Sequence, residues 1–277
     1  MNKKIGLIFA LVLVAFLVMG TASAGLFDFL GGNNSNATAN DDDTFIVGFD
    51  AEFPPYGYKD DSGNYVGFDL DLAKEVCKRN NWTFKAQPID WDAKDAEIDS
   101  GSIDCIWNGF TINGRENDYT WSEPYIDNKQ VVVVKSDANI KSLADLKDKI
   151  VETQKDSSAL AALQGDNKTL ADTFKELKEV ADYNTAFMDL ESGACDAVAI
   201  DIGVAQHQVS SKDNSDDFSI LNDTISSEQY GVGFKKGNTD LKDQVQKTLD
   251  EMFKDGTVQK IAKNYTDSGV PGSLITK

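Results

Sequence analysis

Short apolar runs alternate with amphipathic segments along most of the chain. Residues 45–49 and 130–135 are runs of β-branched and aromatic side chains, which predict buried strands. Residues 68–77 and 241–253 instead place apolar side chains at helical spacing along one face. Strands that alternate with helices predict an α/β fold.

Two stretches of the chain repeat one layout. In residues 100–109 and 192–201 a helix ends at a glycine, an aspartate precedes a buried strand, and the strand runs out into a polar residue. Aligned in this way, Gly109 and Asp201 take equivalent positions at the edges of two sheets. We therefore expect two α/β lobes of similar build that face each other, with Asp201 as the counter-charge for an ammonium group. The alternative for Asp201 is an ordinary helix cap.

The end of the first repeat carries a second charged group. Residues 104–115 begin as a strand and continue into a turn that is rich in hydrogen-bonding groups and ends at Arg115. Small ligands bind at the carboxyl edge of open α/β sheets, and a guanidinium matches the planar shape of a carboxylate. Arg115 is therefore a candidate carboxylate ligand. The alternative is a solvated arginine on a surface turn.

Other candidates for ligand contact follow predicted strands. Phe53 and Trp91 each come shortly after a strand, so the two rings could enclose a ligand at one sheet edge. Either ring alone would more often belong to the core. Ser157 and Ser158 stand between the predicted strand at 149–154 and a short helix. Hydroxyl groups in that place form either an anion-binding cradle or a plain helix cap.

Composition argues against several classes of function. A net charge of −19 and a pI near 4.3 argue against a nucleic-acid partner. Three cysteines without metal-binding spacing and a single histidine give no basis for a metal site, and the sequence contains no phosphate-binding loop. We expect no metal and no cofactor. Cys77, Cys105 and Cys195 are expected to be buried and free, with a Cys77–Cys105 disulfide as the alternative.

The N-terminal part differs from the rest of the chain. Residues 1–24 combine two lysines, an apolar run and an A-x-A cleavage motif, which predicts a secretory signal peptide. An uncleaved membrane anchor is the alternative. Residues 25–43 are rich in Gly, Asn and Asp and predict a flexible linker. The body of the protein is thus expected outside the cytoplasm, in the periplasm or at the cell surface.

Residues 67–76, GFDLDLAKEV, match the signature of the family 3 extracellular solute-binding proteins, and the similarity continues to the C-terminus. These are the polar amino-acid-binding components of ABC importers. The resemblance implies a two-lobed α/β fold of the periplasmic-binding-protein type II, with two hinge strands and a ligand cleft between the lobes. It implies lobe 1 at residues 44–129 and 229–277 and lobe 2 at residues 130–228.

The resemblance also assigns roles by position in the first lobe. Asp50 and Phe53 resemble the ligand contacts of the first loop, and Trp91 resembles a second aromatic wall. Gly109 and Thr111 resemble the residues that bind the α-ammonium and α-carboxylate through backbone and hydroxyl groups.

Three further roles concern the two charged ends of the ligand. Arg115 resembles the carboxylate-binding arginine, Ser158 the second-lobe hydroxyl that shares the carboxylate, and Asp201 the acid that receives the ammonium. The family turn reads T-x-T-x-x-R, whereas here it is one residue shorter and Asn113 replaces the second threonine. Gly114 can compensate for the missing residue with a positive φ.

The function implied by the resemblance is that of a receptor. It would bind an L-amino acid, polar or basic, and deliver it to the permease subunits of an ABC importer. A monomer without enzymatic activity is expected, and it would meet the membrane through the permease or through an uncleaved anchor. Two alternatives share the fold: a secreted dehydratase, for which Glu52 is the candidate general acid, and the sensory subunit of a membrane signalling complex.

Overall fold

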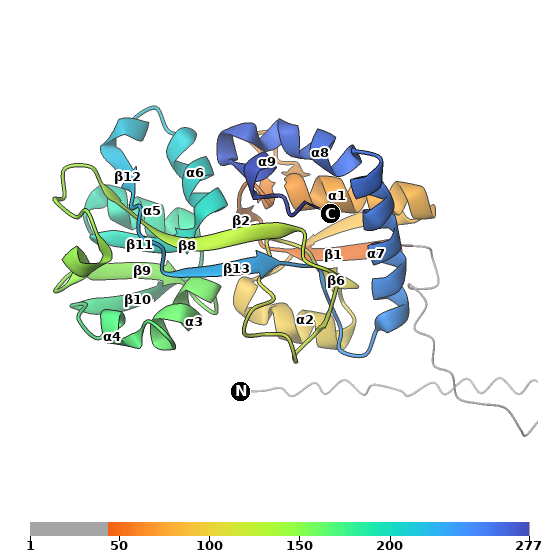
Figure 1. The fold of residues 1–277 in the computed structure, drawn as a ribbon, viewed down its shortest axis with the longest axis horizontal. Helices are drawn as coiled ribbons and strands as arrows, with labels where there is room; N and C mark the ends of the chain where they lie inside the picture. The colour runs from red at the N-terminus through yellow and green to blue at the C-terminus, as the bar shows by residue number, and fades with distance from the viewer. Residues whose placement is uncertain (1–43, 277) are drawn as a thin grey trace, which may run out of the picture. The chain divides into compact units, whose positions relative to one another are not determined.

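The computed structural model describes residues 44–276. The predicted signal peptide, residues 1–24, and the predicted linker, residues 25–43, lie outside the described residues. Figure 1 shows two α/β lobes, connected by the strands labelled β8 and β13. The predicted fold class is thereby confirmed.

The first lobe is built on a five-stranded sheet in the order β5-β1-β6-β14-β7. Its strands are β1 Thr44–Phe49, β5 Thr83–Pro88, β6 Cys105–Ile106, β7 Thr120–Trp121 and β14 Gly233–Phe234. A small second sheet holds β2 Glu52–Phe53, β3 Gly57–Lys59 and β4 Tyr65–Val66. The helices are α1 Phe68–Asn80, η1 Trp91–Ala93, α2 Lys94–Ser100, α7 Thr239–Lys254, α8 Thr257–Ala262, η4 Lys263–Ser268 and α9 Val270–Ser273.

The second lobe is built on a sheet in the order β10-β9-β11-β8-β12, with β13 also paired to β8. Its strands are β8 Ile126–Lys135, β9 Ile150–Gln154, β10 Glu176–Val180, β11 Ala197–Asp201, β12 Phe218–Ile220 and β13 Ser226–Tyr230. The helices are η2 Leu143–Leu146, α3 Ser158–Gln164, α4 Lys168–Ala171, α5 Tyr183–Ser192, α6 Ile202–Ser210 and η3 Ser215–Asp217.

The two lobes repeat one topology. In the first lobe, β1 pairs in parallel with β5 and β6, and β6 also pairs antiparallel with β14. In the second lobe, β9 pairs in parallel with β10 and β11, and β11 also pairs antiparallel with β8. Asp104 and Asp196 accept equivalent backbone hydrogen bonds in the two lobes. The N–H of Ile46 donates to Asp104 at 2.7 Å, and the N–H of Ile150 donates to Asp196 at 2.8 Å. The repeat predicted from the sequence is therefore real.

β8 and β13 pair antiparallel and connect the lobes as hinge strands. β8 begins at Ile126, whereas the sequence predicted its start at Gln130. Its first part alternates exposed Asp127 and Lys129 with the buried polar residues Asn128 and Gln130. A hydrophobic pattern does not reveal such a strand. The predicted lobe boundaries, 129/130 and 228/229, both fall inside the hinge strands.

The buried faces of the helices follow the predicted pattern. The residues of α1 that were expected to share one face are all buried: Phe68, Leu72, Ala73, Val76 and Cys77. The three cysteines are buried and free, so the expectation of buried thiols is confirmed and the alternative of a Cys77–Cys105 disulfide is wrong. Among residues 44–276, no helix has the length and apolarity needed to cross a bilayer.

Candidate ligand-binding site

A small cavity lies between the two lobes. The free volume inside it is about 20 Å³. The first lobe contributes Phe53, Trp91, Asn108, Gly109 and Thr111. The second lobe contributes Gln154, Ser157, Ser158 and Asp201. Both lobes must therefore meet to complete it.

The structure brings most of the predicted site residues together at this cavity. Of the eight predicted residues, those that line it are Phe53, Trp91, Gly109, Thr111, Ser158 and Asp201. Arg115 is not among the lining residues. Its guanidinium donates to Ser158, which lines the cavity, and it lines two neighbouring hollows. Asp50 lies outside the wall, behind Gln154, and lines a neighbouring hollow.

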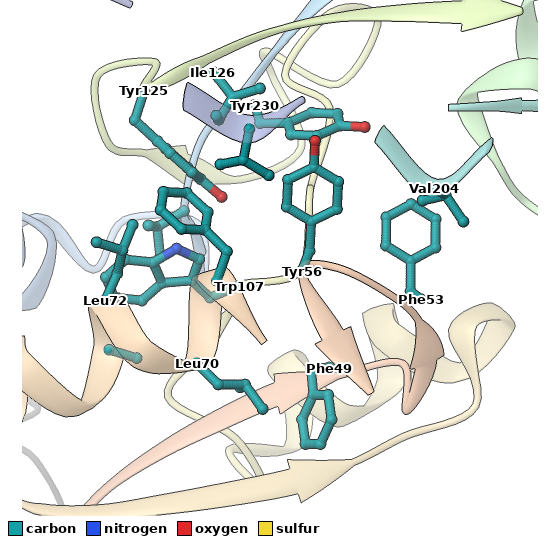
Figure 2. Packing of buried hydrophobic residues seen from close by; sticks show 14 of the residues in the cluster. Phe49, Phe53, Tyr56, Leu70, Leu72, Trp107, Tyr125, Ile126, Val204 and Tyr230 are labelled. Carbon is teal, nitrogen blue, oxygen red and sulfur yellow. The ribbon is translucent and has the colours of Figure 1, made fainter. Parts of the chain in front are cut away.

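The aromatic wall of the first lobe is tightly packed around a glycine. Figure 2 shows Phe53 facing Val204 of α6, with Tyr56 between Phe53 and Tyr230. The rings of Tyr56 and Tyr230 meet edge to face with centroids 5.2 Å apart. Gly109 has φ +58°, and a Cβ there would lie 2.9 Å from the Phe53 ring and 3.0 Å from the Tyr230 ring. Both the positive φ and the lack of space for a Cβ require glycine at this position.

The amide of Gly109 is held by an acid from the family signature. Asp69, in the first turn of α1, accepts the Gly109 N–H at 2.5 Å and the Tyr125 hydroxyl at 2.8 Å. Complete burial raises the pKa of Asp69 to about 7, against the lowering effect of these two bonds. Asp69 therefore fixes the binding loop onto α1. The Gly109 N–H is thereby occupied and is not available to a ligand.

The Thr111 hydroxyl donates to Glu228 of β13 at 2.7 Å. Because a hydroxyl has one proton to donate, the oxygen of Thr111 can only accept a further hydrogen bond while this contact holds. An acceptor suits an ammonium group. This geometry differs from a hydroxyl that donates to the ligand carboxylate, which the resemblance implied as one role at this position.

The Asp201 carboxylate does not cap the helix that follows it. Asp201 is at the N-terminus of α6, yet no cap hydrogen bond forms to its side chain. Instead Oδ1 accepts from the Asn128 and Gln130 amides, each at 2.7 Å, and from the Tyr230 hydroxyl. Burial and the nearby Glu228 raise the pKa of Asp201 to about 7. The carboxylate is thus buried and in contact with the cavity, as a counter-charge for an ammonium must be.

The cation next to the cavity is Arg115. Nη1 of Arg115 donates to Oγ of Ser158 at 3.0 Å, and Nη2 donates to the Asp156 carbonyl at 3.0 Å. The shortened turn is closed by Gly114, which has φ +82° as its position suggested. Ser157 is the helix cap, because its Oγ accepts the Leu160 N–H at 3.1 Å. Ser158 is therefore the hydroxyl that links the cation to the cavity.

Asp50 is positioned by a side chain from the other lobe. It accepts the Glu52 N–H at 2.8 Å and Nε2 of Gln154 at 2.6 Å. Burial raises the pKa of Asp50 to about 6. Asp50 therefore reaches the cavity only through Gln154. Glu52, the candidate general acid, bonds to Asn184 and lines the same outer hollow rather than the cavity.

The sequence reasoning missed several residues of this region. Asn108 and Gln154 line the cavity, and Glu228 bonds to both hinge-strand amides. Asn108 directly follows the predicted strand and precedes Gly109, which was a usable signal. Glu228 carried none, because its partners are more than ninety positions away in the chain.

Two α/β lobes with a cavity between them that residues of both lobes line have the build of a solute-binding protein. Residues 45–268 match the family of bacterial extracellular solute-binding proteins, family 3. The chain belongs to this family, as its resemblance predicted.

Similar proteins span most of the chain. The L-cystine-binding protein TcyJ of Escherichia coli K12 is 30% identical over 82% of this chain and 84% of its own length. A substrate-binding protein of an ABC uptake transporter from Streptococcus pneumoniae, solved with bound histidine, has a TM-score of 0.78 and 31% identity and covers 80% of this chain and 92% of its own. An ancestral arginine-binding protein bound to arginine has a TM-score of 0.74 and 38% identity, over 80% of this chain and 98% of its own.

Proposed function

We propose that the protein binds an L-α-amino acid in the cavity between its lobes and delivers it to the permease of an ABC importer. The observation that carries the proposal is the placement of opposite charges at one cavity. Asp201 lines it, and the guanidinium of Arg115 donates to Ser158, which lines it too. An amino acid carries the complementary pair of charges at every pH near neutrality.

Each end of the ligand has a defined set of partners in this proposal. Arg115 and Ser158 hold the α-carboxylate, because a guanidinium and a hydroxyl both donate. Asp201, the Thr111 oxygen and the Gly109 carbonyl receive the α-ammonium, because all three can accept. These groups come from both lobes, so the ligand stabilises the closed arrangement, and closure excludes water and strengthens each charged hydrogen bond.

The ligand side chain would lie between Phe53 and Trp91, the two aromatic residues of the cavity wall. A polar or basic side chain fits best, because Gln154 lines the same space and places Asp50 directly behind it. The histidine-bound and arginine-bound structures of similar proteins support this class of ligand.

The finer aspects of location and partner follow from the same proposal. The family is extracellular, and we place this protein outside the cytoplasm, with its N-terminal segment either cleaved or kept as an anchor. The closed form would be the shape that the permease recognises. A purely receptor role, without catalysis, is supported by the position of Glu52 away from the cavity.

A thermal-shift screen of the purified protein against the common L-amino acids and L-cystine tests the proposal. A ligand that binds only the folded state raises the melting temperature, and at a hundred times its Kd the gain is about 2.7 kcal/mol. At least one polar or basic amino acid should raise the melting temperature of the wild type and fail to do so for Asp201→Ala. No shift with any amino acid, together with turnover of a prephenate-type acid, would favour the dehydratase instead.

A further inference from the structure

Glu228 is a second buried acid beside Asp201. Glu228 is 7% exposed and Asp201 is 4% exposed. Glu228 lies on β13 and Asp201 ends β11, and these two strands pair with opposite edges of β8. The two acids therefore flank the hinge strand that connects the lobes.

The two carboxylates share their hydrogen-bond donors. Nδ2 of Asn128 donates to Asp201 at 2.7 Å and to Glu228 at 2.8 Å. Nε2 of Gln130 donates to the same two carboxylates at the same two distances. Thr111 adds a bond to Glu228, and the Tyr230 hydroxyl adds one to Asp201. All of these donors are neutral.

Two carboxylates in one buried site do not both ionise easily unless a cation joins them. Within the described part of the chain, every hydrogen-bond partner of Asp201 and Glu228 is an amide or a hydroxyl. The raised pKa of Asp201, caused by burial and by Glu228, agrees with this picture. One additional positive charge next to the pair would therefore allow both acids to be ionised.

Several other charged or titratable groups lie near the pair. Arg115, Asp156 and Asp166 line one hollow together with Glu228. The Tyr56 and Tyr183 phenols feel the charge of Asp201 from the first-lobe loop and from α5, and Tyr230 lies on β13 itself. Burial raises the pKa of all three phenols, so they stay neutral across the range where acids titrate. Asp50 also has a raised pKa and is held by Gln154, so it needs its own control.

We propose that Asp201 and Glu228 act as one acid pair, which holds a proton in the ligand-free protein and releases it when an ammonium group binds. The inference rests on the proposed function, because it supplies the second acid of the ammonium site. The step is balanced: the pair loses one proton to the solvent, its charge changes from −1 to −2, and the ammonium of the ligand adds the compensating positive charge.

Proton release makes the affinity depend on pH. Below the pKa of the pair, one bound proton must leave for each ligand that enters, so the affinity falls by up to about tenfold for each pH unit. Glu228→Gln keeps the shape and the acceptor oxygen but leaves a single acid. Without its negative neighbour Asp201 ionises more readily, and the variant should bind with little proton release.

Isothermal titration calorimetry with L-arginine, L-histidine and L-cystine tests the proposal. Each is titrated at about pH 6 in two buffers with different ionisation enthalpies, which reports the protons released. The wild type should release close to one proton, Asp50→Asn should release nearly as much, and Glu228→Gln should release far less. Glu116→Gln, an exposed acid near the site, is the control and should match the wild type. Equal proton release by the wild type and Glu228→Gln would overturn the proposal.

A measurement without ligand separates this proposal from the function that it rests on. Carbon-detected NMR follows the side-chain carboxyl groups through a pH titration, with Asp201→Asn and Glu228→Gln used for assignment. The wild type should show a proton bound to the pair above the pH range in which ordinary carboxyl groups titrate, and Glu228→Gln should lose this transition. If no amino acid binds but the transition is present, the proposed function fails and the acid pair stands. If both acids titrate below a pH of about 5, the acid pair fails.

Discussion

Lys94 and Asp156 form an ion pair across the cleft, with Lys94 from the first lobe and Asp156 from the second. Lys94 is only 2% exposed, whereas the Asp156 side chain is 51% exposed. Asp156 stands two residues after β9 and has φ +54°. Its carbonyl accepts from Trp91 Nε1 at 3.3 Å and from Arg115 Nη2 at 3.0 Å. One residue of the second lobe is thus held by three residues of the first.

The first prediction concerns this contact. Asp156→Asn keeps a residue that tolerates the left-handed conformation but removes the charge that pairs with Lys94. Closing the cleft would then bury an unpaired ammonium. Because Asp156 is half exposed, we expect the loss of binding free energy to be near the low end for such ion pairs, about 1–2 kcal/mol. This loss corresponds to a ligand affinity that is roughly five- to thirtyfold weaker. Calorimetry measures the affinity, and small-angle scattering measures the shift toward the open form.

The matched control for this change is Asp172→Asn. Asp172 pairs with Lys168 on the surface, and both side chains are exposed. This variant should leave the affinity and the scattering curve unchanged. Equal effects of the two substitutions would mean that the Lys94–Asp156 contact plays no part in closure.

The second prediction concerns the ammonium site. Asp201→Ala leaves a ligand ammonium in a closed cavity without its acid and should cost about 2–5 kcal/mol of binding free energy. Asp137→Ala, at an exposed turn, should cost nothing. Isothermal titration calorimetry with the ligand found in the thermal-shift screen gives both values. An unchanged affinity in Asp201→Ala would refute the assignment of Asp201.

The third prediction concerns pH and Asp69. Burial raises the folded-state pKa of Asp69 to about 7, so its contribution to stability is fully present below its unfolded pKa and is lost as the pH rises through about 7. Asp69→Asn resembles the protonated form and can accept the same two hydrogen bonds through its amide oxygen. The gain in stability of the variant over the wild type should therefore be smaller near pH 5 than near pH 8.

Urea unfolding at the two pH values measures this difference. The comparison between the variant and the wild type removes the effect of all other acids that titrate in the same range. A difference in unfolding free energy that does not change with pH would show that Asp69 is ionised throughout.

The fourth prediction concerns Gly109. Gly109→Ala brings a Cβ against the rings of Phe53 and Tyr230 and also strains a backbone with positive φ. Gly193→Ala strains a similar backbone, φ +79°, but meets no atom within 4 Å. Both variants should lose about 1 kcal/mol of stability through the backbone. Only Gly109→Ala should also weaken ligand binding, as measured by calorimetry, and equal affinities would show that the rings can move aside.

The fold could be predicted because local patterns determine it. The helical face of α1, the glycine that ends α2, and the aspartates before β6 and β11 are each visible within about ten residues of sequence. The repeat then indicated two lobes of one topology, and the hydrogen bonds of Asp104 and Asp196 confirm it.

The part of the site that could not be predicted depends on long-range polar contacts. Asn128 stands before the predicted strand at 130–135 and Gln130 at its start, yet both are buried in a hinge strand, where their amide nitrogens donate to two acids far away in the chain. The same limit applies to Asp50, which resembles a direct ligand contact but is turned toward Gln154. Local sequence shows which groups can form hydrogen bonds, but only the tertiary structure shows which groups they meet.

A crystal structure of the protein with the amino acid that stabilises it most would test the central claim most directly. The account predicts a ligand carboxylate within about 3 Å of Arg115 and Ser158, an ammonium within the same distance of Asp201, and a side chain between Phe53 and Trp91. A ligand bound outside this cavity, or one with its ammonium toward Arg115, would contradict it.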